Sequence, residues 1–219
     1  MTRAELIKSI SKENPFISNQ DLICKVLISE ILTMKLKCGD SLSQNKLSID
    51  FNLSRGPVKL ALEKMESNGY LAHDETGAFY VAKPGIRFAA DIHSFKRQLD
   101  LLAANQALYD ISKDRLELLH ECYVSMSKSF NEKNFVRFCH CDLKFHQTIV
   151  DASQNTFLKD TYTRYQNLFL FMCICAETDE RLFGRLLHQH QKIYIALKNR
   201  QSEALQDAVN AHYSSLILF

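Results

Sequence analysis

Apolar residues recur every three or four positions over most of the chain, which is the spacing that lines one face of an α-helix. In the first part, "DLICKVLISEILTMKL" carries such a stripe, and further helices are predicted over 43–51 and 54–68. The segments 70–73 and 78–82 read instead as two short strands, because a Gly-containing turn joins two brief apolar runs. Helix, helix, tight turn, helix and hairpin is the order of a winged helix-turn-helix.

From residue 86 onward the pattern is helical throughout. All three prolines and five of the six glycines lie before Ile86, so turns concentrate in the first part. The predicted helices of the second part cover 88–109, 113–131, 134–152, 156–176, 179–199 and 202–217. We therefore predict a mostly α protein with two domains: a winged helix-turn-helix DNA-binding domain over 1–85, and an all-α helical domain for effector binding and dimerisation over 86–219.

Composition restricts the partners and the cellular compartment that we expect for this protein. The net charge of +2 does not by itself indicate a nucleic-acid or membrane partner. The most apolar segment, "LFLFMCICA", is too short to span a bilayer, so no membrane partner is expected. Seven cysteines are an odd number, and "MTRAELIKSI" lacks the apolar run of a signal peptide. These features favour a cytoplasmic protein with reduced thiols.

The third predicted helix begins with "SRGPVK". In a helix-turn-helix, the N-terminal residues of the second helix of the motif contact base edges in the major groove. Here those residues are Ser54, Arg55, Gly56 and Lys59. An arginine can make two hydrogen bonds to guanine, and a hydroxyl at a helix N-terminus suits a phosphate. Arg55 and Lys59 fit an ordinary solvated helix face equally well, because two basic residues are common.

A longer stretch of the sequence supports DNA binding by this domain. "GDSLSQNKLSIDFNLSRGPVKLALEKMESNGYL", followed by "TGAFYVA", resembles the DNA-binding domain of the GntR family of bacterial transcription regulators. The resemblance covers residues 21–83 and implies base and phosphate contacts from the recognition helix, supporting contacts around it, and a wing that approaches the minor groove. The residues that it assigns to DNA are Arg55, Lys59, Ser54, Gly56, Asn45 and Gly77.

Three positions depart from the family pattern. Asn45 stands where an arginine is frequent, Gln44 where glutamate is usual, and Lys59 where arginine is usual. A lysine is a point charge without the planar fork of arginine. The preferred bases can therefore differ from those of the family.

The segment "FCHCDLKFHQTIV" concentrates metal-binding side chains. Helix residues four apart share a face, whereas residues two apart point in nearly opposite directions. Asp142 and His146 consequently lie together in the apolar stripe of their helix, and His140 points away. His190 and His212 fall on the apolar stripes of the last two helices. A buried carboxylate requires a partner or a metal.

Two explanations fit these four groups. Each histidine alone is explained by a hydrogen-bonded core side chain. Together, three imidazoles and one carboxylate also suit Zn, Ni, Mn or Fe, with open positions for water or a ligand oxygen. The nearby cysteines are interpreted as structural, because Cys-x-Cys spacing on a helix points two thiols apart: Cys139, Cys141, Cys173 and Cys175.

The stretches "DLKFHQTIVDASQN", "HQHQKIYIAL" and "AVNAHY", behind a GntR-type head, resemble the FCD domain, the effector domain of regulators related to the fatty-acid regulator. The resemblance implies that a divalent metal, zinc before Ni, Mn or Fe, is held beside a small organic acid effector. The implied metal ligands are Asp142, His146, His190 and His212. The family often has Arg-x-x-Leu-Glu in the first helix of this domain, where this chain has "KRQLD". Weaker effector contacts are expected from Lys96, Arg97, Arg164 and Asn167.

These features predict a homodimeric transcription regulator, not an enzyme. It would bind double-stranded DNA at a short inverted repeat, and a small carboxylate bound beside the metal would change its operator affinity. The alternatives are a regulator that responds to the metal itself, a metal-dependent hydrolase or oxygenase that uses the same Asp/His site, and an effector domain with core histidines and no metal.

Overall fold

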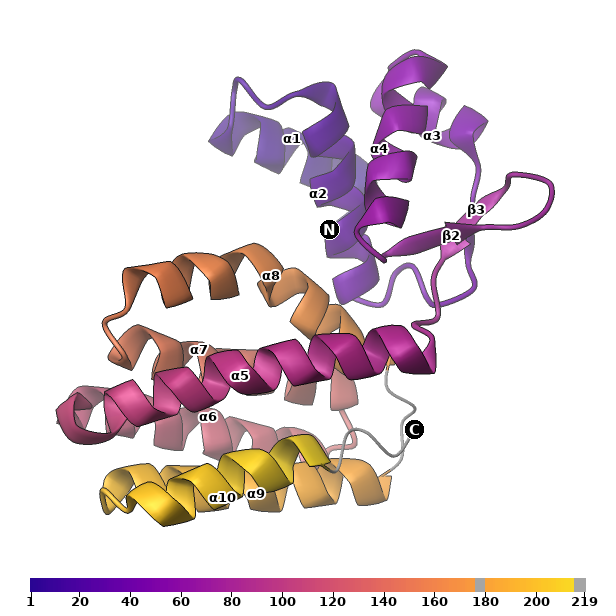
Figure 1. Ribbon diagram of the computed structural model, residues 1–219. Helices are drawn as coiled ribbons and strands as arrows, with labels where there is room; N and C mark the ends of the chain where they lie inside the picture. The colour runs from indigo at the N-terminus through magenta and orange to yellow at the C-terminus, as the bar shows by residue number, and fades with distance from the viewer. Residues whose placement is uncertain (176–179, 215–219) are drawn as a thin grey trace. The chain divides into compact units, whose positions relative to one another are not determined.

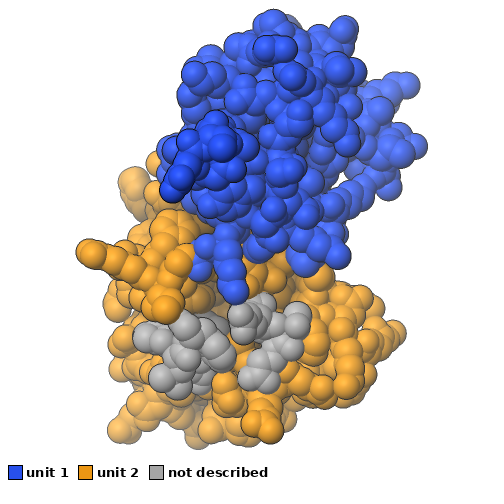
Figure 2. All heavy atoms as spheres, turned by 90° about the vertical axis from the view of Figure 1, so that its right-hand side faces the viewer, with its two compact units in different colours: residues 1–84 blue, residues 85–219 orange. Residues whose placement is uncertain are grey.

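The chain forms two units, residues 1–84 and 85–219, shown in blue and orange in Figure 2. The computed structural model describes residues 1–175 and 180–214. Helices of the first unit are α1 (Arg3–Glu13), α2 (Asn19–Leu32), α3 (Gln44–Phe51) and α4 (Arg55–Ser67), and its strands are β1 (Ser41–Leu42), β2 (Leu71–His73) and β3 (Phe79–Val81) (Figure 1).

A small antiparallel sheet forms the wing. β3 lies between β1 and β2 and pairs with both. The turn after β2 is closed by Asp74, whose carboxylate accepts hydrogen bonds from the backbone N–H groups of Thr76 and Ala78. Gly77 completes the turn with a φ of 80°, a conformation that other residues rarely adopt. The two predicted strands are thus present, whereas the two-residue β1 was not predicted because it is too short to show an alternation.

Helices α2, α3 and α4 pack around one apolar core. α2 packs on α4, and four residues of these helices are fully buried: Val26, Leu27, Val58 and Leu62. Ser54 is the residue before α4, and Pro57 falls in its first turn, where a missing N–H breaks no helical hydrogen bond. The recognition helix therefore begins where the sequence predicts.

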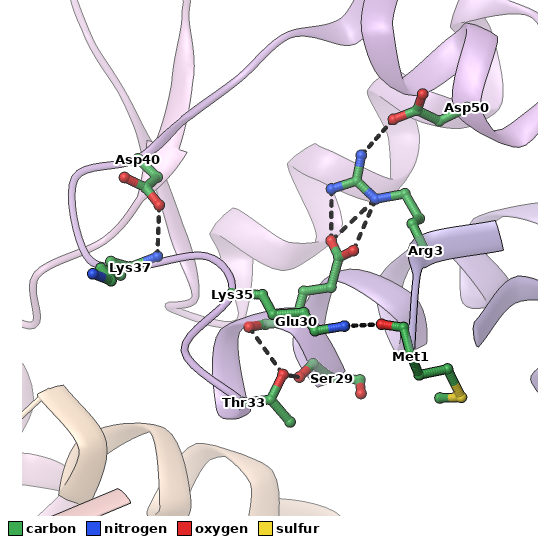
Figure 3. A network of polar contacts seen from close by, with 9 residues as sticks. All are labelled: Met1, Arg3, Ser29, Glu30, Thr33, Lys35, Lys37, Asp40 and Asp50. Carbon is green, nitrogen blue, oxygen red and sulfur yellow. Dashed lines mark hydrogen bonds and ion pairs between the residues drawn. The ribbon is translucent and has the colours of Figure 1, made fainter. Parts of the chain in front are cut away.

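The guanidinium group of Arg3 connects an additional helix, α1, with α2 and α3 (Figure 3). Arg3 donates from Nε and Nη2 to the Glu30 carboxylate of α2, at 3.0 and 2.6 Å. Its Nη1 donates to Asp50 of α3 at 2.5 Å. Glu30 is 5% exposed, so Arg3 supplies the counter-charge that its burial requires. Helix α1 was not predicted from the sequence.

We expect Arg3→Ala to weaken this unit, because it leaves the Glu30 carboxylate buried without a partner. Since Arg3 is itself partly exposed and water can replace some of the contact, the expected loss in local opening free energy is about 2 kcal/mol. Hydrogen exchange of the α1 and α2 amides in the full chain measures it. The control is Lys64→Ala, which breaks the exposed pair with Asp21 and should cost below about 0.5 kcal/mol. Equal losses in the two variants would contradict the special role of Arg3.

The second unit consists of helices over its described residues. They are α5 (Ile86–Asp110), α6 (Lys113–Asn131), α7 (Phe135–Ala152), α8 (Thr156–Cys175), α9 (Glu180–Lys198) and α10 (Ser202–Ser214) (Figure 1). α7 packs on α5, α6 and α8, while α10 packs on α5 and α9. The six predicted helices are present, although their predicted positions 176, 179 and 215–217 lie outside the described residues. Within residues 1–175 and 180–214, no helix is long and apolar enough to cross a membrane.

One disulfide corrects the expectation that all thiols are reduced. Cys139 of α7 and Cys173 of α8 are bonded, with their Cα atoms 5.7 Å apart. Cys141 and Cys175, two residues further along each helix, are thiols. Spacing within one helix correctly separates the two cysteines of each Cys-x-Cys pair. It carries no information about a partner on a neighbouring helix, and the packing of α7 on α8 supplies that partner.

Candidate metal centre

Four side chains from three helices converge inside the second unit. Asp142 and His146 come from α7, His190 from α9 and His212 from α10, and one ligand atom from each lies within 4.8 Å of all the others. The three imidazoles are buried and the carboxylate nearly so. Two atoms that bind one ion at about 2.1 Å lie about 4.2 Å apart on opposite sides of it and about 3.4 Å apart in a tetrahedral shell, so seating a metal would need a closing movement of about 0.5 to 1.5 Å.

The hydrogen bonds of His190 determine which of its ring atoms faces this centre. Its Nδ1 lies 2.7 Å from the carbonyl oxygen of Leu186, and a carbonyl can only accept. Nδ1 therefore carries the proton, and a neutral His190 presents the Nε2 lone pair to the cluster. This atom lies 2.9 Å from Asp142 Oδ1 and 3.2 Å from His146 Nε2.

His146 is oriented in the same way by a carboxylate. Its Nδ1 lies 2.9 Å from Asp100 Oδ2 on α5, which leaves its Nε2 free to face His190. Three acceptor atoms thus meet without a donor between them when the rings are neutral. A carboxylate or carbonyl on the distal ring nitrogen is the usual outer contact of a metal-bound histidine. Such a convergence requires a cation, either a proton or a metal ion.

His212 adds a fourth group. Its Nδ1 is buried without a hydrogen-bond partner among the residues that the structure describes. Its ring lies 4.6 Å from that of His190 and 5.1 Å from that of His146, measured between centroids. An unpaired imidazole nitrogen in the core costs free energy unless something binds it. The donor set therefore fits a divalent ion.

The carboxylates of the centre are held in their charged form. Burial alone would raise the pKa of Asp142, but the neighbouring His146, His190 and Lys96 hold it well below its usual range. Burial likewise opposes ionisation of Asp100, whose pKa is nevertheless lowered by His146, Lys96 and a hydrogen bond from Tyr213. Charged carboxylates are the form that binds a metal.

His146 and His212 are held in their neutral form. Burial lowers the pKa of His146, although Asp100 and Asp142 oppose the shift. The pKa of His212 is lowered by burial and by the neighbouring His190 and His146, again against Asp142. A neutral imidazole is the metal-binding form, so both kinds of ligand are prepared for an ion at neutral pH.

The weaker effector residues divide into two groups. Lys96 is 7% exposed, and its Nζ lies 3.1 Å from Asp100 Oδ2 and 2.7 Å from the Tyr213 hydroxyl, so it belongs to the buried cluster. Arg97 donates to Asn210 of α10 at 3.0 Å. Arg164 and Asn167 are exposed. The structure does not bring these two to the cluster, because α8 turns Tyr162 and Phe169 inward instead.

Sequence reasoning assigned no role to Asp100, Tyr162 or Tyr213, three groups around the same centre. Asp100 lies one helical turn after Lys96 in "KRQLD", and Tyr213 directly follows His212. The Tyr213 hydroxyl donates to Asp100. The i,i+4 spacing of Lys96 and Asp100 is the one local signal that could have indicated a buried ion pair.

The residues expected to contact DNA lie on the surface of the first unit. Ser54, Arg55, Gly56 and Lys59 are exposed at the N-terminal end of α4, and Ser54 makes no capping hydrogen bond with its side chain. Asn45 is exposed in the first turn of α3, and Gly77 in the turn of the wing. A Cβ atom added at Gly56 or Gly77 would meet nothing within 4 Å. These six positions are therefore accessible to a ligand.

Comparison with known proteins shows which family the chain resembles. The family model of the FCD domain matches residues 91–215. The HTH-type transcriptional regulator YdhC of Bacillus subtilis is 24% identical over 179 residues, which are 81% of this chain and 80% of that protein. A gluconate operon transcriptional repressor of Bacillus licheniformis is 22% identical, over 85% of this chain and 78% of the repressor.

A solved structure shares the fold. It is a putative GntR transcriptional regulator of Rhodococcus sp. RHA1, 17% identical, with a TM-score of 0.74 over 90% of this chain and 95% of that chain. Fold and likeness together define the class: a DNA-binding transcription regulator rather than an enzyme, with a helix-turn-helix head and an all-α regulatory domain. The chain belongs to the FCD-domain branch of the GntR family.

The second unit should lose stability in mild acid when no metal is bound. Burial and the neighbouring Lys96 lower the pKa of His93 to about 4, although Asp142 opposes the shift. Between pH 6.5 and 5 the unfolded chain binds a proton at this residue that the folded chain does not. The free energy of unfolding should therefore fall by about 2 kcal/mol over that window from His93 alone.

Urea unfolding of EDTA-treated protein at several pH values measures this. His93→Gln should reduce the pH dependence by that amount, whereas the matched change at the exposed His188, His188→Gln, should leave it unaltered. An unchanged pH dependence in His93→Gln would show that His93 takes up protons equally in both states.

Proposed function

We propose that this regulator binds a divalent metal through Asp142, His146, His190 and His212, and that a small organic acid bound beside the metal changes its operator affinity. The observation that carries the proposal is the meeting of His146 Nε2, His190 Nε2 and Asp142 Oδ1 in the core without a donor among them. A bound metal would supply the missing positive charge and a coordination position for a ligand oxygen.

Zinc is the metal that we propose, with Ni, Mn and Fe as the other ions that the donor set suits. Three imidazoles and one carboxylate are common zinc ligands, and zinc can accept a fifth ligand beside four from the protein. The effector would then be a carboxylate that approaches the open side of the ion. A relative whose name connects it with a gluconate operon supports this ligand class, because gluconate is a carboxylate.

The head would read DNA through α4. Arg55 is placed to bind a guanine edge and Lys59 a phosphate, with Ser54, Gly56 and Asn45 in support and Gly77 near the minor groove. Two heads of a homodimer in the cytoplasm would occupy the two halves of a short inverted repeat. A change at the metal centre can reach the head along the chain, because α5 carries Lys96 and Asp100 and directly follows residue 85.

A regulator that responds to the metal itself remains the second candidate. Four protein ligands can complete a tetrahedral shell, as they do in structural zinc sites. In that case operator affinity would change with metal alone, at physiological concentration and without an organic acid. Operator titrations with metal alone, and with metal plus carboxylate, separate the two functions.

Arg55→Ala should reduce affinity for an operator fragment, selected from random DNA with the wild-type protein, by about 10- to 100-fold. Lys59→Ala should instead weaken binding to all sequences and lower the slope of log affinity against log salt by about 1. Fluorescence anisotropy at several salt concentrations measures both. Lys64→Ala, on the same helix but beyond the contact region, is the control. Wild-type operator affinity in Arg55→Ala would contradict the assignment of Arg55 to a base contact.

His212→Ala should lower metal affinity at least about 100-fold, because it removes one of four ligands. His188→Ala is the matched control, since His188 is two residues from His190 but exposed. Native mass spectrometry of protein purified without added metal reports metal identity and stoichiometry, and the same spectrum gives the number of subunits. Full metal occupancy in His212→Ala excludes that residue as a ligand, and a monomer mass contradicts the dimer.

A further inference from the structure

The recognition helix α4 carries a large apolar residue, Leu60, that the core does not cover. Leu60 is 55% exposed, whereas four other apolar residues of this helix are buried: Val58, Ala61, Leu62 and Met65. A single exposed leucine is common on protein surfaces, so exposure alone indicates no function. The position of Leu60 on the helix is what makes it informative.

Leu60 lies on the face that α4 turns away from the core. The buried residues of the helix occupy one side, and Gly56 and Leu60, which are one turn apart, lie on the opposite side. Arg55 and Lys59 lie along one flank of this outward face. A helix-turn-helix inserts the second helix of its motif into the major groove. A helix docked in this way turns Leu60 toward base edges.

Contacts with α2 fix the position of Leu60 on this face. The side-chain amide of Gln20 donates to the backbone carbonyl of Leu60 at 3.0 Å, and Lys64, one turn further along α4, pairs with Asp21 at 2.8 Å. Gly56 has no side chain, and a Cβ atom added there would meet nothing within 4 Å. A base edge can therefore approach Leu60 from the N-terminal end of the helix.

The chemistry of a leucine restricts the base that it can contact. In the major groove, guanine, adenine and cytosine present hydrogen-bond donors and acceptors, whereas thymine also presents its C5-methyl group. A leucine against a purely polar base edge would remove water from donors and acceptors without replacing their hydrogen bonds, which costs free energy. Against thymine, the leucine covers a methyl group that would otherwise face water. An exposed leucine in the groove therefore favours thymine.

We propose that Leu60 contacts the C5-methyl group of a thymine in each half of the operator and thereby selects that base. This inference rests on the proposed function, because α4 must lie in the major groove. It adds a specificity-determining residue of apolar character to the polar contacts of Arg55 and Lys59.

The length of helix between Leu60 and Arg55 sets the distance between the bases that they contact. Leu60 lies five residues after Arg55. Five residues span about 7.5 Å along a helix, and successive base pairs are about 3.4 Å apart. The thymine should therefore lie within about two base pairs of the base that Arg55 contacts.

The test removes one methyl group from the DNA and one side chain from the full-length protein. Each thymine of the operator fragment selected with the wild-type protein is replaced in turn by deoxyuridine, which lacks the C5-methyl group, and affinity is measured by fluorescence anisotropy. In the wild type, one replacement in each half-site should weaken binding about fourfold, the effect of leaving one methyl group uncovered. Leu60→Ala should bind thymine and deoxyuridine at that position with equal affinity.

Lys59→Ala is the matched control, because it shortens another exposed side chain of the same helix. It should weaken binding to both DNAs and keep the difference between thymine and deoxyuridine. Leu60→Met, which keeps an apolar side chain of similar volume, should also keep that difference. Leu60→Ala should melt at the wild-type temperature, because the side chain that it shortens is exposed.

Base-pair changes that weaken binding of the wild type but not of Arg55→Ala locate the base of Arg55. The inference is overturned if no deoxyuridine replacement weakens wild-type binding, if Leu60→Ala keeps the preference for the methyl group, or if the responsive thymine lies outside the predicted spacing. Each of these results can occur while Arg55→Ala and Lys59→Ala lose affinity as expected, and then the proposed polar contacts stand. Failure of the wild type to select any DNA sequence overturns both the inference and the proposed DNA binding.

Discussion

Lone pairs from three helices, α7, α9 and α10, meet in the core of the second unit, and this meeting constrains the residues around it. In neutral His190 and His146 the Nδ1 protons are committed to Leu186 and Asp100, so both Nε2 atoms and Asp142 Oδ1 face inward as acceptors. In a neutral ring, moving the proton from Nδ1 to Nε2 would break the outer hydrogen bond that the Nδ1 proton makes. A proton or a divalent ion at this point would relieve the conflict, and a divalent ion would do so without protonating a ligand.

The outer contacts make α5 part of the same centre. Asp100 accepts hydrogen bonds from His146, Lys96 and Tyr213, which belong to α7, α5 and α10. One carboxylate thus connects His146, a proposed metal ligand, with Lys96. A ligand that draws Lys96 toward itself weakens the Lys96–Asp100 pair and changes the environment of His146. Ligand and metal should consequently influence each other's binding, and by thermodynamic linkage the influence is mutual.

The features that the sequence predicted correctly involve residues that are close together along the chain. The helices, the wing and the placement of Asp142 and His146 on one face follow from local periodicity, because residues four apart are neighbours in any helix. His190 and His212 were found because each interrupts an apolar stripe. The role of Asp100 was missed, as was the Cys139–Cys173 bond, because their contacts join different helices and leave no periodic trace. Arg3 belongs with them, since its partners are 27 and 47 residues away.

The two units deal with buried charge differently, and the difference bears on regulation. In the first unit the buried Glu30 is neutralised by Arg3, a partner within the chain. In the second, Asp100 pairs with Lys96 and His146, while Asp142 lies against imidazole nitrogens, where the proposed metal would supply positive charge. A ligand can shift a conformational equilibrium only as far as it binds one state better than the other. If the core of a domain needs a bound ion or ligand to balance its charges, an exchangeable ligand can shift the conformational equilibrium of that domain. A core whose charges are already balanced would respond less.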